Sequence, residues 1–117
     1  MGIWNFLVRR RKARLVRRVA SQVAERSHAA VMDRVRRRAN SMRVAEARRY
    51  VRSRALEIVH REMSALHGRA SFDTATQTAI IANATEAVMT RVLTELRTDA
   101  KAVSTTAKRT AGRRDAA

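Results

Sequence analysis

The sequence has 117 residues, a net charge of +16 and neither cysteine nor proline. The length predicts a single domain, and the lack of cysteine excludes disulfides, thiolate metal sites and cysteine nucleophiles. With 3% aromatic residues and only 3 glycines, the composition favours long helices and a thin core. A chain without cysteine also suits a reducing compartment, so we expect a cytoplasmic protein.

Positive charge is concentrated in the first part of the chain. Residues 1–69 hold 19 Lys and Arg against 5 acids, whereas residues 70–117 hold 7 against 5. We therefore expect one helical domain over residues 1–117 with three parts. These are a basic helical region (1–69), a near-neutral packing helix (70–107) and a frayed, basic, flexible tail (108–117).

The first predicted helix covers residues 5–38. Its apolar residues, from Val16 through Val23 to Val35, recur at steps of three and four, as on one face of an α-helix. Asn40 and Ser41 form a polar break, and we expect Ser41 to cap the next helix. Because this break is weak, the alternative is one continuous helix through both segments.

The second predicted helix covers residues 42–66, and the third begins near Asp73 or Thr74. Thr74 and Gln77 have the spacing of a capping box. We predict an all-α fold in which two or three long amphipathic helices form a hairpin or a small bundle. The residues expected to pack the third helix are Ile81, Val88, Val92, Leu96 and Val103.

Basic residues in the first two segments follow helical spacing. Such rows match successive phosphates, because an arginine fork can contact two phosphate oxygens at once. The few acids in these segments do not make the mixed-charge face of an ordinary solvated helix. We therefore expect a non-enzymatic protein that binds the backbone of structural RNA or DNA electrostatically, without reading base sequence. The residues expected to bind are Arg9, Arg10, Arg11, Lys12, Arg14, Arg17, Arg18, Arg34, Arg36, Arg37, Arg38, Arg48, Arg49 and Arg52.

The apolar start of the chain supports other partners. Trp4, Phe6, Leu7 and Val8 precede a basic run, and such a segment suits an anionic membrane surface or a partner protein. No segment approaches the roughly 20 apolar residues of a membrane span. A further alternative is a helical scaffold subunit of a larger assembly, and the thin core favours a homo-oligomer.

Two Glu-x-x-His motifs, Glu25–His28 and Glu57–His60, have the spacing of di-iron ligands in helical bundles. At 100° per residue, Glu25, Glu57 and His60 face away from the apolar stripes, whereas bundle ligands face inward. The hydroxyls of residues 104–106 have no histidine or acid placed to activate them, and no glycine-rich phosphate loop is present. We expect no metal, no cofactor and no enzymatic activity.

Overall fold

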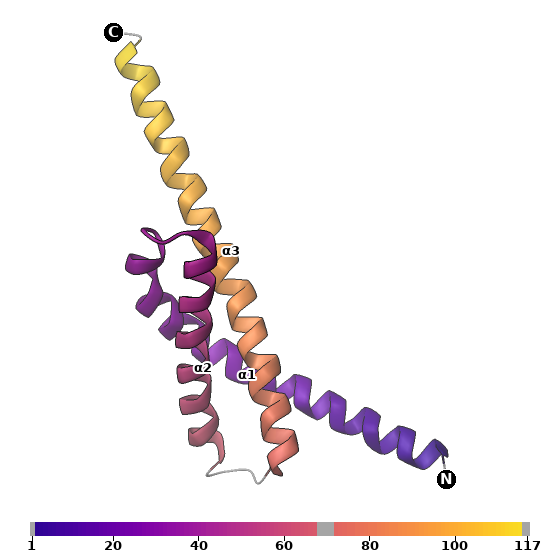
Figure 1. The fold of residues 1–117 in the computed structure, drawn as a ribbon. Coiled ribbons are helices and arrows are strands. Elements are labelled where there is room, and N and C mark those ends of the chain that lie inside the picture. The colour runs from indigo at the N-terminus through magenta and orange to yellow at the C-terminus, as the bar shows by residue number, and fades with distance from the viewer. Residues whose placement is uncertain (1, 68–71, 116–117) are drawn as a thin grey trace.

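Three long helices make up the fold (Figure 1). A computed structural model describes residues 2–67 and 72–115, with side chains for residues 2–66 and 72–102. Helix α1 spans Gly2–Ala39, α2 spans Val44–His67 and α3 spans Thr74–Asp115. Each helix packs against the other two, and the described residues include no strand. The all-α prediction is confirmed, and the bundle has three helices rather than two.

A short turn separates α1 from α2, so the two helices are not continuous. The backbone amides of Ser41 and Met42 donate to the carbonyl oxygens of Arg38 and Ala39, each at 3.2 Å. The Ser41 hydroxyl also donates to the Arg38 carbonyl, at 3.0 Å. The prediction that Ser41 caps the second helix is therefore wrong. Its hydroxyl closes the end of α1, and α2 begins only at Val44.

Asp73 caps the start of α3. Its Oδ1 accepts a hydrogen bond from the Thr76 amide at 2.7 Å, and its carbonyl oxygen accepts one from the Gln77 amide at 2.9 Å. Hydrogen bonds with the side chain and backbone of Thr76 lower the pKa of Asp73 below its ordinary value. Thr74 lies inside the helix, so the expected capping box with Thr74 as the cap is not formed. The cap is the preceding residue, whose carboxylate satisfies free helix amides.

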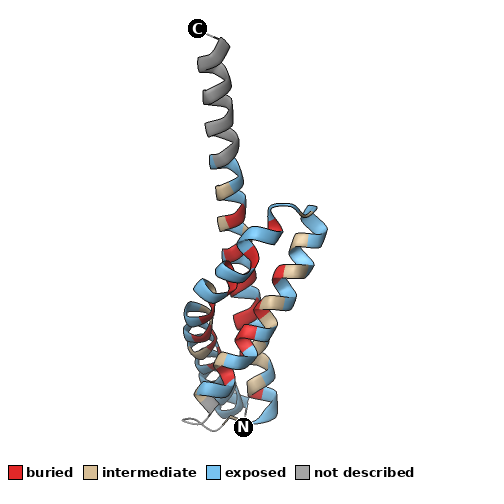
Figure 2. Ribbon diagram, turned by 90° about the vertical axis from the view of Figure 1, so that its left-hand side faces the viewer, coloured by how far each residue is buried: buried red, intermediate tan, exposed pale blue. Residues whose placement is uncertain are grey.

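The buried positions lie where the helices face one another (Figure 2). Most of them carry short side chains. Ile80 and seven valines are the largest fully buried hydrophobic residues. Among the described residues, the aromatic side chains of Tyr50 and Phe72 pack only at the edge of this core. Small side chains let the helices approach closely, in agreement with the aromatic-poor composition.

Two helices extend beyond the core, one at each end of the chain (Figure 1). The molecule measures 77 × 29 × 23 Å with a radius of gyration of 19.5 Å, whereas a compact chain of this length has about 13 Å. Val16 is the first buried residue of α1, so residues 2–15 are exposed. Helix α3 continues to Asp115, through most of the segment 108–117 for which we expected a frayed tail.

Candidate nucleic-acid interface

The fourteen basic residues predicted to bind nucleic acid are all exposed, on α1 and α2. Two of them have a carboxylate partner among the described residues. Lys12 Nζ lies 3.5 Å from Asp73 Oδ2, and Arg36 Nε lies 3.4 Å from Asp99 Oδ2. Such solvent-exposed pairs hold a side chain only weakly. The other twelve form no ion pair in the described part of the chain, so their charges are available to a partner.

These residues form two groups near the two ends of α1. The first, the amino-terminal basic segment, is residues 9–18, which hold seven basic residues and no acid. The second, the turn cluster, is residues 34–54 around the α1–α2 turn, with nine arginines and one acid, Glu46. At a rise of 1.5 Å per residue, Arg14 and Arg36 lie about 33 Å apart along α1. The fourteen residues therefore form two separate patches rather than one compact patch.

Buried contacts beneath the turn cluster hold its two helices together. Val35 and Ala39 on α1 and Val51 on α2 are buried in the shared core. The Tyr50 hydroxyl donates to the carbonyl oxygen of Arg34 at 3.4 Å, which ties the start of α2 to the end of α1. The arginines on these turns therefore project from backbones that are fixed relative to each other.

Arg54 and Arg43 belong to the turn cluster but were not predicted as binding residues. Arg54 Nη1 donates to Glu57 Oε2 at 2.9 Å, and its guanidinium lies 5.4 Å from the centre of the Tyr50 ring. Contacts with Tyr50 and then Glu57 raise the pKa of Arg54, whose charge is therefore engaged inside the protein. Arg43 is exposed in the turn. Its place beside the polar break at residues 40–41 was the signal that could have identified it.

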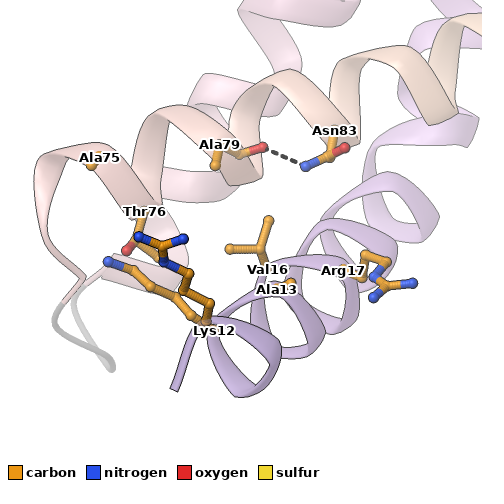
Figure 3. Close-up of a pocket in the computed structure, with 9 residues that line it drawn as sticks. Lys12, Ala13, Val16, Arg17, Ala75, Thr76, Ala79 and Asn83 are labelled. Atoms are coloured by element: carbon orange, nitrogen blue, oxygen red, sulfur yellow. Dashed lines mark hydrogen bonds between the residues drawn. The ribbon is translucent and has the colours of Figure 1, made fainter. Parts of the chain in front are cut away.

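A groove lies where α1 meets the first turns of α3 (Figure 3). It has a volume of about 470 Å³, and Val16 points into the space between the helices. The Asn83 side-chain amide donates to the Ala79 carbonyl at 3.0 Å, so it is engaged within α3. No histidine or carboxylate is among the residues that line the groove. Its lining consists of Arg9, Lys12, Ala13, Val16, Arg17, Ala75, Thr76, Ala79 and Asn83.

Three of the four Glu-x-x-His side chains contact partners other than each other. Glu25 Oε1 accepts from Arg91 Nη1 at 2.7 Å, and His28 Nε2 lies 3.0 Å from Glu95 Oε1. Both contacts join α1 to α3, whereas Glu57 pairs with Arg54 within α2. The described residues contain no group of three or more His, Cys, Asp or Glu that could hold a metal ion. The expected lack of a metal, a cofactor and catalysis stays a prediction.

The apolar stripe of α3 packs within the chain. Val88, Val92 and Leu96 are buried in the core and Ile81 packs against it, while the Val103 side chain lies outside the described residues. A partner helix would have to displace α1 or α2 to reach the buried positions. Self-association through this stripe stays a prediction, and it would need other surfaces of α3.

The apolar residues at the start of α1 remain uncovered. Trp4, Phe6, Leu7 and Val8 are all exposed. Ile3, which was not among the predicted contact residues, is exposed with them and belongs to the same apolar run. In the described part of the chain, none of the helices combines the length and the apolar character needed to cross a bilayer.

Comparisons with known proteins provide no relative from which a function could be inferred. No family model, no curated protein and no solved structure matches the chain. What can be inferred about its partners comes from the placement of charge and apolar surface on the three helices.

Proposed function

We propose that the protein binds the phosphate backbone of nucleic acid electrostatically, chiefly through the turn cluster, with the amino-terminal basic segment adding contacts. The observation that carries this proposal is the set of twelve exposed basic residues without a carboxylate partner in the described structure. Like charges at helical spacing repel one another and destabilise their helix. A polyanion that lies across them relieves this repulsion.

The arrangement favours an extended anion over a small one. The two basic groups lie about 33 Å apart along α1, and a small anion could contact only one of them. A duplex or a folded RNA presents phosphates over such a length, and each arginine can contact two phosphate oxygens.

The position of Tyr50 favours double-stranded or folded nucleic acid over a single strand. Single-strand binding commonly uses exposed rings on which bases stack. Tyr50 is the only aromatic residue in the turn cluster, and it is half-buried with its hydroxyl bonded to the Arg34 carbonyl. Binding would therefore depend on backbone charge and shape rather than on base identity.

A pair of charge-matched variants tests the turn cluster. The first replaces Arg37, Arg38 and Arg49 with glutamine, which keeps a good helix propensity. The control replaces three other arginines with glutamine and lowers the net charge equally. All six side chains are exposed and have no ion pair in the described structure. The control positions are Arg26, Arg61 and Arg97.

Binding of a labelled duplex RNA or DNA, measured by fluorescence anisotropy across a salt series, gives the readout. Loss of three phosphate contacts should reduce the log–log salt slope by about 2.7 on B-DNA. We expect the turn-cluster variant to bind at least about tenfold more weakly at moderate salt, and the control to change far less. Equal weakening of both variants would show that the turn cluster is not the interface. Failure of the unmodified protein to bind duplex at low salt would refute the proposal altogether.

A further inference from the structure

The first two turns of α1 carry apolar side chains that no other helix of the described structure covers. Within α1, the Arg10 guanidinium lies 6.0 Å from the centre of the Phe6 ring. Residues 3–8, here called the apolar tip, include Ile3, Trp4 and Phe6 with exposed fractions of 79%, 73% and 59%. Leu7 and Val8 are about half exposed. At 100° per residue these five side chains cover an arc of roughly 200° around the helix axis. A contiguous apolar patch of this kind marks an interaction site, unlike single exposed apolar residues.

The bundle does not support the helix beneath the apolar tip. Lys12 makes the first ion pair from α1 to α3, and Val16 is the first residue of α1 to be buried. The preceding turns extend away from the other helices (Figure 1). A free helix of fewer than about 12 residues is only marginally stable in water. The first turn of α1 also has no acidic residue whose negative charge would stabilise the helix N-terminus. A partner that covers the apolar tip would supply the missing stabilisation.

We propose that the apolar tip inserts at the surface of an anionic membrane while the amino-terminal basic segment contacts the lipid phosphates. Seven basic residues follow the tip within residues 9–18, and no acid occurs before Glu25. Trp4 and Phe6 bring aromatic rings to the tip, and indole rings in particular favour the boundary between headgroups and acyl chains. Arginine side chains can lay their apolar stems along the membrane and keep their charged ends at the headgroups. Apolar insertion and anionic attraction together are what an interfacial helix requires.

Charge argues against a second copy of the chain as the occupant. Residues 1–24 contain no acid, so a second apolar tip would offer the seven basic residues no ion pair, and in a parallel pairing the two basic segments would lie side by side and repel each other. The nearest apolar groove, between α1 and α3, offers a second copy no better site. Arg9, Lys12 and Arg17 line it, so it would repel the basic segment that follows an incoming tip.

Nucleic acid does not account for the apolar tip. Phosphates attract the basic segment, but they give no gain from burying Ile3, Leu7 or Val8. The membrane proposal therefore goes beyond the proposed function, and it depends on different side chains from those of the turn cluster.

The test uses the full chain and its one tryptophan, Trp4. Because that indole lies in the apolar tip, its fluorescence reports directly on the proposed site. The chain is mixed with vesicles of phosphatidylcholine alone or of phosphatidylcholine with phosphatidylglycerol. We expect the anionic vesicles to shift the emission to shorter wavelength and to carry the protein upward in a flotation gradient. Neutral vesicles should produce a much smaller shift and little flotation.

Two variants separate the apolar tip from exposed apolar surface in general. The double variant Ile3→Gln/Leu7→Gln keeps the net charge and should lower partition into anionic vesicles at least about tenfold. The control Val44→Gln alters a residue that is 85% exposed at the start of α2 and should partition like the unmodified chain. Helix content from circular dichroism should be the same for all three proteins in buffer.

The possible outcomes decide the proposal. A vesicle-dependent shift that the double variant loses, while its duplex binding is unchanged, supports membrane insertion. Absence of a shift with anionic vesicles overturns the proposal and leaves the turn cluster unaffected. A shift that rises with protein concentration without vesicles would assign the apolar tip to a second copy. A shift produced by duplex RNA but not by vesicles would assign it to nucleic acid, and either result overturns the membrane proposal.

Discussion

The turn cluster and the amino-terminal basic segment are alike in charge and differ in what supports them. The turn cluster lies on two helices that buried valines and Tyr50 hold together. The amino-terminal basic segment lies on one helix, where α1 leaves the bundle, and adjoins five exposed apolar side chains. Arginine content alone would assign both groups the same partner. Because their neighbours differ, we propose that the first chiefly binds an extended polyanion, and that the second also serves an interface that accepts apolar groups.

The largest expected effect contrasts two isoleucines, one in the core and one in the apolar tip beside the amino-terminal basic segment. Ile80 is fully buried in the core, whereas Ile3 is 79% exposed. Ile80→Ala should lower the free energy of unfolding by about 3 kcal/mol, because it leaves a cavity. Ile3→Ala should change it by less than about 0.5 kcal/mol. Urea unfolding followed by circular dichroism measures both, and comparable losses would mean that the apolar tip packs against protein in solution.

A second experiment neutralises three arginines in each region and measures vesicle binding. Replacing Arg10, Arg11 and Arg14 with glutamine should weaken binding to anionic vesicles about hundredfold, since each basic residue near such a surface contributes about 1 kcal/mol. The turn-cluster variant of Arg37, Arg38 and Arg49 has the same net charge and serves as its control. It should bind vesicles within about threefold of the unmodified chain. Cosedimentation with vesicles provides the affinities, and equal losses would remove the functional distinction between the two regions.

The smallest expected effect is where the amino-terminal basic segment meets the bundle, because Asp73 there caps α3 and pairs with Lys12. Hydrogen bonds with Thr76, and to a lesser extent Lys12, lower the pKa of Asp73 from its ordinary value of 3.8. The folded state therefore gains stability from the ionised carboxylate above that value and loses it as the pH falls through the lowered pKa.

Asp73→Asn should keep the helix cap but lose this pH dependence, whereas Asp73→Ala should lose both. Thermal unfolding midpoints at pH 7 and pH 3 are the measurement. The difference in unfolding midpoint between the unmodified chain and Asp73→Asn should be smaller at pH 3 than at pH 7. A gap that stays constant with pH would show that the Asp73 carboxylate does not titrate differently on folding.

The helices were predictable from sequence, but their caps were not. Apolar residues at steps of three and four identified the helical segments, because burial of one face sets that period, but they left open whether the first two segments were one helix. Ser41 and Thr74 were wrong as caps because the sequence does not show which free backbone groups a polar side chain will satisfy. Ser41 bonds backward to Arg38, and Asp73 precedes Thr74 as the acceptor.

Exposure of the basic residues was also predictable, because residues 1–69 hold too few acids to pair with them. Their separation into two regions was not recognised from the sequence. Periodicity shows which face of a helix is apolar, but it does not show where a neighbouring helix begins. The bundle reaches α1 only near Lys12 and Val16, since α3 starts at Thr74 beside them. For the same reason, the sequence could not show that the apolar stripe of α3 is buried within the bundle rather than free to bind a partner.

Because α1 extends past its neighbours, the free energy of local opening should differ between its first turns and its middle. Amide hydrogens near Val23, Val31 and Val35 lie over the core, so they should exchange with solvent only when the whole bundle opens. Amides in residues 6–15 need only local fraying and should exchange much faster. Hydrogen exchange along this single helix would therefore show which surface a ligand covers. Slowed exchange confined to the first turns would indicate contact there without any change in the bundle.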